Sequence, residues 1–161
     1  MNNALYFLTA LTAVGSGVVG GVLFAFSSFI MRALARLTPE QGIAAMQSIN
    51  ITVINPLSGI LFLGTALTSV FLIIVSLTRF SDPGSIYLLA GSLLYVVAIL
   101  ITGAFNVPLN NELASVQPSS SVGAELWAHF IPTWTKWNHV RTLACIGSSA
   151  LLIISLSKFF K

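Results

Sequence analysis

Long stretches of this chain contain no Asp, Glu, Lys or Arg, and they alternate with short zones that hold all eleven charged residues. A helix needs about 20 apolar residues to cross roughly 30 Å of hydrocarbon. Three of the uncharged stretches exceed that length, and the fourth, at 16 residues, is shorter. The stretches are residues 1–31, 41–78, 83–111 and 142–157. The pattern therefore predicts membrane-spanning helices.

The first two predicted helices differ in whether the sequence contains a helix break. The first is predicted over residues 4–35, and the second starts at Pro39, with Thr38 as its N-cap. A single helix over 39–77 would be about 58 Å long, nearly twice the bilayer core. Asn55-Pro56 is the natural break, because a residue before proline is disfavoured in helical conformation. Residues 39–54 are therefore predicted as an interfacial helix that precedes the second span.

The third helix is predicted over 86–107, with a kink or unwinding at Pro108. The fourth helical region is predicted over 124–157, with an interfacial beginning and a span from about Trp134. That span would be about 36 Å long and would place Arg141 about 10 Å inside its start. The predicted fold is an all-α membrane protein, a four-transmembrane-helix bundle in a single domain over 1–161. An interfacial helix precedes helix two and another precedes helix four.

Small residues in the first helix form two neighbouring rows. Such rows let the backbones of membrane helices approach closely, and they are common. We therefore interpret them as a packing face before a channel lining. The first row is Thr9, Ala13, Gly17, Gly21 and Ala25, and the second is Thr12, Ser16 and Gly20.

Composition supports the membrane assignment and narrows the partners. Hydrophobic residues make up 56% of the chain and charged residues 7%, whereas soluble domains have about 25% charged residues. The net charge is +3, but seven basic residues in four zones form no continuous stripe, so nucleic acid is not an expected partner. Membrane lipids, an apolar aromatic small molecule and further copies of the chain are the partners that these features allow.

Polar side chains are costly inside a membrane, so those that occur there are candidates for function. Three groups stand out: Asn50 with Asn55, the region of Asn106, Asn110 and Glu112, and residues 134–141. On helix three, Asn106 and Asn110 lie four residues apart and share a face. The alternative is that these asparagines only cap a broken helix end.

On helix four, Trp134, Asn138 and Arg141 follow helical spacing and share one stripe, which Trp137 flanks. His139 lies two residues before Arg141, about 200° round the helix. Tryptophans can instead anchor at the interface while basic side chains reach toward phosphates. For Arg141, at its greater depth, we expect a buried partner, and Glu112 is the candidate counter-ion.

Familiar metal patterns are missing from the sequence. Two histidines ten residues apart and a single cysteine give no zinc or iron–sulfur ligand set. No metal is predicted. The first helix carries no acidic residue of the kind that proton-coupled exporters use, which disfavours a transporter.

Four segments resemble the bacterial DUF1772 family, which is grouped with fungal anthrone oxygenases. They are FSSFIMRAL at 26–34, AAMQSIN at 44–50 followed by Asn55-Pro56, NVPLNNELA at 106–114, and WTKWNHVRT at 134–142. The resemblance implies a multi-pass membrane protein, of the bacterial inner membrane, with an anthrone-oxygenase-like assignment. It implies no cofactor, and dioxygen would be the co-substrate.

The resemblance suggests roles for the candidate residues. His139 would be the base, and Arg141 with Asn110 would hold an oxyanion. The remaining candidates would bind the substrate: Asn50, Asn55, Asn106, Glu112, Trp134, Trp137 and Asn138. The alternative is a non-catalytic bundle that binds a lipid, a quinone or a partner membrane protein.

Overall fold

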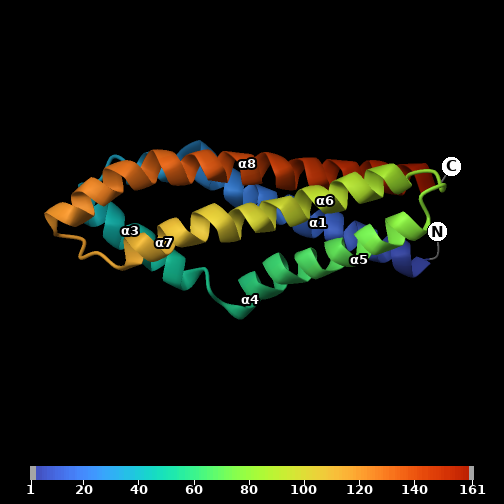
Figure 1. Cartoon of the computed structure of the whole chain (residues 1–161), viewed down its shortest axis with the longest axis horizontal. Helices are drawn as coiled ribbons and strands as arrows, with labels where there is room; N and C mark the ends of the chain where they lie inside the picture. Colours follow the sequence, from blue (N-terminus) through green and yellow to red (C-terminus); the bar gives the residue numbers. More distant parts are fainter. Residues whose placement is uncertain (1–2, 160–161) are drawn as a thin grey trace.

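A computed structural model describes residues 3–159, and every regular element within that range is helical (Figure 1). The four-helix membrane bundle predicted from the sequence is confirmed, because four helices are long and apolar enough to span a bilayer. The spans are Asn3–Leu34, Pro56–Thr78, Ser85–Ala114 and Ser121–Phe159. The elements are α1 (Asn3–Ala25), η1 (Phe26–Ile30), α2 (Met31–Leu34), α3 (Pro39–Thr52), α4 (Pro56–Gly59), η2 (Ile60–Gly64), α5 (Thr65–Thr78), α6 (Ser85–Ile101), η3 (Thr102–Asn106), α7 (Val107–Ala114) and α8 (Ser121–Phe159).

The spans form an elongated bundle in which α1 and α6 both pack against α8, and α5 packs against α6. Figure 1 shows both termini at the end of the bundle where α5 turns into α6, while α3 and α7 lie toward the other end. The turn uses Gly84 in a left-handed conformation at φ 92°, which favours glycine. Ser155 of α8 donates a 3.0 Å hydrogen bond to the Gly84 carbonyl. The turn is thereby fixed to the far end of α8.

The face of α1 that packs in the bundle contains the second row of small residues and the buried start of the first row, Thr9 and Ala13. Thr12, Ser16 and Gly20 are buried, and Ser16 shares a 3.1 Å hydrogen bond with Ser148 of α8. A Cβ atom at Gly20 would lie 3.3 Å from Cβ of Cys145, whereas one at Gly21 would meet nothing within 4 Å. The first row therefore leaves the interface before its end, because the helix rotates past its neighbour.

The second span is separated from α3 by three residues that are not helical, 53–55. Asn55 caps α4: its Oδ1 accepts a 3.0 Å hydrogen bond from the backbone N–H of Ser58. Pro56 then occupies the first turn of α4, where its missing N–H has no cost. Asn55 is thus explained by capping as well as by any role in binding.

The third span does not unwind at Pro108. It continues through the π-helical segment η3 into α7 and ends at Ala114, seven residues beyond the predicted end. A proline ring in a regular α-helix collides with the carbonyl of residue i−4. The wider π turn that immediately precedes Pro108 relieves this contact, so the helix bends without breaking.

Helix α8 is a single element of 39 residues, with Pro132 inside it. Its length of about 58 Å exceeds the bilayer core, so part of it extends beyond the hydrocarbon. Residues 121–133 continue into the span without a break, rather than forming a separate helix before it. Tertiary packing of this first part against α3 and α7 compensates for the proline.

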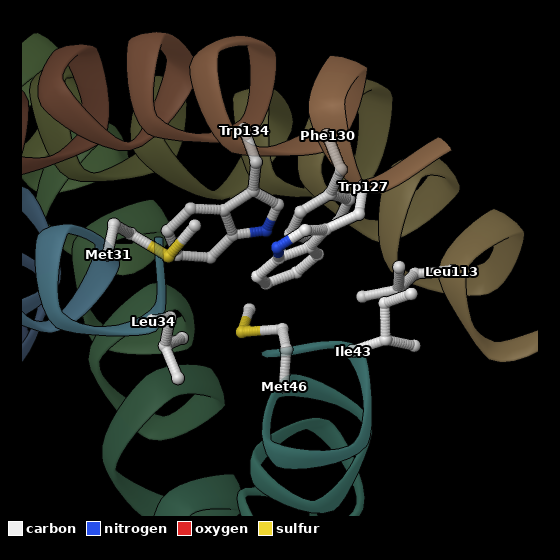
Figure 2. Packing of buried hydrophobic residues seen from close by; sticks show 8 residues of the cluster. All are labelled: Met31, Leu34, Ile43, Met46, Leu113, Trp127, Phe130 and Trp134. Atoms are coloured by element: carbon white, nitrogen blue, oxygen red, sulfur yellow. The ribbon is translucent and has the colours of Figure 1, made fainter. Parts of the chain in front are cut away.

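A compact hydrophobic cluster closes the bundle at the end that carries α3. In Figure 2, Ile43 and Met46 of α3 face the aromatic side chains that α8 presents. Gly42 makes this approach possible, because a Cβ atom there would lie 2.6 Å from the indole ring of Trp127. The buried members of the cluster are Met31, Leu34, Ile43, Met46, Leu113, Trp127, Phe130 and Trp134.

The adjacent glycines of α1 provide a matched test of the packing. Gly20→Val should lower the stability of the folded bundle by about 1–3 kcal/mol relative to Gly21→Val, because only residue 20 faces Cys145 and Ile146 of α8. Both changes alter helix propensity equally, so the difference isolates the steric contact. Thermal unfolding of the two purified variants in detergent measures it, and equal midpoints would contradict this interface.

Candidate functional site

A cavity of about 860 Å³ lies between α3, α4, α7, α8 and the end of α1, next to the hydrophobic cluster. That volume is within the range of sites that hold small organic ligands. Most of its wall is apolar, and Arg141 is the only charged residue that lines it. The wall comprises Val22, Leu23, Phe26, Met46, Gln47, Ile49, Asn50, Ile51, Val53, Ile54, Asn55, Pro56, Ser58, Gly59, Phe62, Thr102, Val107, Asn110, Asn111, Ala114, Trp134 and Arg141.

The rim of the cavity is also apolar. Ile51 is 74% exposed and Ile54 is 84% exposed, and both contribute to the cavity wall. Large aliphatic side chains exposed to this degree at the mouth of a cavity favour lipid over water as the adjoining medium. The mouth of the cavity therefore presents an apolar surface.

Arg141 projects from α8 into the bundle and is 5% exposed. Its Nη2 donates a 2.8 Å hydrogen bond to Oδ1 of Asn138, and its Nη1 donates a 3.2 Å bond to the hydroxyl of Thr102. The guanidinium carbon also lies 5.2 Å from the centroid of the Trp134 ring, within the range of a cation–π interaction. No carboxylate in residues 3–159 forms an ion pair with it, so the charge is held by dipoles and an aromatic face alone.

Asn138 lies behind Arg141 and links α8 to the first span. Its side-chain amide donates to the Leu23 carbonyl at 2.8 Å and to the Ser27 hydroxyl at 2.7 Å. Its oxygen accepts the bond from Arg141. A fully buried asparagine with both ends bonded fixes the guanidinium relative to two helices.

Trp134 forms a rigid wall of the cavity. Its indole N–H donates a 2.8 Å hydrogen bond to Oδ1 of Asn110, and its ring packs against Phe26 with centroids 5.5 Å apart. Asn106 donates to the Trp134 carbonyl at 3.2 Å. The asparagines of α7 and η3 therefore position Trp134, and Asn106 makes no side-chain capping bond to its own helix.

Some polar atoms at this end have no partner. Nε of Arg141 and Nδ2 of Asn50 are buried donors without an acceptor, and both residues line the cavity. A buried unpaired donor is unfavourable by about 1–3 kcal/mol. Both atoms lie just beneath the cavity surface, so they belong to the polar part of a mostly apolar wall.

Three of the four spans carry a π-helical segment beside this cavity, and each supplies a wall residue. These residues are Phe26 in η1, Phe62 in η2 and Thr102 in η3. The carbonyl of Phe62 accepts a 3.1 Å bond from the hydroxyl of Tyr95. Single π turns inside α-helices recur at functional sites. Phe26 and Phe62 were not predicted as wall residues, because no residue pattern in the sequence marks a π turn.

The predicted site residues divide into three sets. Five line the cavity: Asn50, Asn55, Asn110, Trp134 and Arg141. Asn106 and Asn138 are buried behind it, where they hold Trp134 and Arg141. Glu112, Trp137 and His139 are not among the wall residues. Gln47 is an additional wall residue, whose amide donates to the carbonyls of Leu113 and Val116.

The three residues outside the cavity have other surroundings. Glu112 is exposed and forms no ion pair with Arg141, so the structure does not provide the expected counter-ion. Trp137 stacks on Phe105, with ring centroids 3.7 Å apart. His139 is exposed on the face of α8 opposite to Arg141, because positions two residues apart in a helix are separated by about 200°. The structure therefore places His139 and Arg141 on different faces of α8, as their spacing predicts, so these two candidate catalytic residues do not share one site.

Replacing Asn138 tests the buried network. Asn138→Leu should destabilise the bundle by about 3 kcal/mol, because it leaves the Arg141 guanidinium and the Ser27 hydroxyl without this partner. Asn111→Leu, at an exposed position of α7, is the matched control and should change stability by less than about 0.5 kcal/mol. Chemical unfolding in detergent compares the two, and equal losses would refute a network centred on Asn138.

Comparison with known proteins agrees with this geometry. No curated protein and no solved structure matches the chain. The family model described as anthrone oxygenase matches residues 54–151. The matched region begins before α4 and includes Asn110, Trp134, Asn138 and Arg141. Since the match covers more than half of the 161 residues, the chain belongs to the anthrone oxygenase family.

Proposed function

We propose that this membrane protein is a cofactor-independent oxygenase that oxidises an apolar aromatic substrate of the anthrone type, taken up from the bilayer. The observation that carries the proposal is the single buried guanidinium in the wall of a large apolar cavity. A cation without a carboxylate partner stabilises negative charge that develops on a bound substrate. Family membership agrees with this chemistry.

The reaction requires little from the protein. The CH₂ group between the aromatic rings loses a proton, and the resulting anion places its charge on the carbonyl oxygen. This anion passes one electron to dioxygen, and the two radicals combine to form a carbon–oxygen bond. The peroxide takes up a proton and loses water, leaving a carbonyl group. The CH₂ group and dioxygen thus become a carbonyl group and one water molecule.

Arg141 would stabilise the anion, and the aromatic wall would orient the rings. Arg141 and Asn50 line the cavity, and a small rotation of each side chain would bring its buried, unpaired N–H group to a substrate oxygen. Trp134, fixed by Asn110, and Phe26 would present flat surfaces to a flat substrate. No Asp, Glu, His or Lys is among the wall residues. The proton would therefore pass to solvent, and catalysis would depend on a lowered pKa of the substrate CH₂ group, which the charge of Arg141 would produce by stabilising the anion.

The lack of a general base in the wall also favours a second candidate, a quinone- or phenol-binding protein without turnover. The same donors would bind the oxygen of a quinone. The two proposals share a ligand class and differ in whether oxygen is consumed, so oxygen uptake separates them.

Substituting Arg141 tests the catalytic proposal. With emodin anthrone under oxygen, the purified protein should consume oxygen faster than buffer, and Arg141→Gln should reduce kcat about 100-fold. Arg141→Lys should retain part of the rate, because lysine keeps the positive charge but lacks the planar guanidinium group with its several N–H donors. Arg79→Gln, at the opposite end of the bundle, is the control and should retain full activity.

The outcome separates the two candidates. If the wild type binds the ligand but consumes oxygen no faster than buffer, the oxygenase proposal is wrong and the binding role is favoured. An equal rate for wild type and Arg141→Gln, in folded protein, would remove Arg141 from the mechanism.

Two glycines of the second span test whether the cavity is the binding site. Added Cβ atoms at Gly59 and Gly64 meet nothing within 4 Å, but only Gly59 lines the cavity. Gly59→Trp should fill the cavity and raise KM by at least about tenfold, which corresponds to about 1.4 kcal/mol of binding energy. Gly64→Trp should leave KM unchanged. Similar KM values for the two variants would place the substrate elsewhere.

A further inference from the structure

A second hollow of about 330 Å³ lies on the opposite face of α8 from Arg141, between α8 and the end of the first span. Its wall contains three basic side chains, and the principal cavity shares none of its residues. The residues that line it are Ser27, Met31, Arg32, Ala35, Ile131, Pro132, Thr135, Lys136 and His139. His139 therefore belongs to this second hollow, which the proposed oxidation does not use.

The basic side chains of the hollow have no acidic partner. Arg32, Lys136 and His139 are exposed, and none forms an ion pair within residues 3–159. Lys136 lies 5.8 Å from the Trp137 ring centroid, a contact that leaves its charge intact. The hydroxyl of Thr135 is buried without a hydrogen-bond partner. Three basic side chains thus surround a space that no carboxylate of residues 3–159 fills, and the Thr135 hydroxyl is buried behind it.

The position along α8 places the hollow at the level of lipid headgroups. Near the far end of α8, Ser157 is the last residue before Lys158, which belongs to the charged zone on the other side of the membrane. Lys136 precedes Ser157 by 21 residues, and at 1.5 Å per residue this distance is about 31 Å, close to the thickness of the hydrocarbon core. Basic side chains at that depth face phosphates.

We propose that this hollow binds the phosphate group of an anionic phospholipid. Arg32 and Lys136 neutralise the phosphate, while His139 donates a hydrogen bond to it. Met31 and Ile131 provide an apolar wall beside these donors, which suits the first carbons of an acyl chain. A free phosphate ion would use the same donors but not this wall, so the lipid is the better fit.

Lipid binding to the whole purified protein tests this proposal. The delipidated chain is mixed with phosphatidylglycerol or phosphatidylcholine at equal concentration, and native mass spectrometry measures the fraction that retains one lipid. The wild type should prefer phosphatidylglycerol roughly tenfold, as expected for two basic side chains near a phosphate. The double variant Arg32→Gln, Lys136→Gln should lose the preference, and Lys136→Arg should keep it.

The matched control is the double variant Arg79→Gln, Lys158→Gln, which removes two exposed charges at the opposite end of the bundle. It should retain the preference for phosphatidylglycerol. No preference in the wild type, or an equal loss in both double variants, would overturn the site. In a further arm, millimolar inorganic phosphate should not displace the lipid. Displacement would overturn the lipid as the occupant, in favour of free phosphate.

Discussion

The buried guanidinium of Arg141 constrains the arrangement of the whole site. A charge in an apolar interior is unfavourable unless other groups replace water around it. Here a neutral amide, a hydroxyl and an aromatic face take that role, each from a side chain whose own position is fixed. Because no carboxylate cancels the charge, its field extends into the cavity. A carboxylate partner would have stabilised the arginine equally well, but it would have left nothing to attract an anionic substrate.

The π turns bring the required groups to one level. Ser27 and Thr102 lie in η1 and η3, and each is a member of the hydrogen-bonded chain that contains Arg141. A π turn shifts the register of one helix relative to its neighbours, so residues that would face lipid in a regular helix can face the interior. In η2, the carbonyl of Phe62 accepts from the backbone N–H of Thr65 and also from the hydroxyl of Tyr95 on the neighbouring helix. The irregular backbone and the polar site are thus two aspects of one structural feature.

The sequence predicts most of the bundle but less of the site. Four spans follow from the uncharged stretches, because they depend only on helix length, and the burial of Arg141 follows from its place inside the fourth span. The π turns could not be predicted, because they depend on tertiary contacts rather than on a residue pattern. Pro108 appeared to end a helix, but η3 accommodates it. The partners of Arg141 were misjudged for a related reason: charge alone favoured Glu112, whereas packing supplies Asn138 and Thr102.

The cavity and the outer hollow lie on opposite faces of α8, yet Ser27 connects them. Its hydroxyl lines the hollow and accepts a hydrogen bond from Asn138, which in turn holds Arg141. The hydroxyl of Thr142 already donates to the Asn138 carbonyl, so Ser27 must be the donor in its 3.1 Å contact with Thr142. An anion in the hollow could take only that single proton. The bond from Asn138 uses a lone pair of the Ser27 oxygen and would persist, so occupancy of the hollow would leave the geometry of Arg141 unchanged.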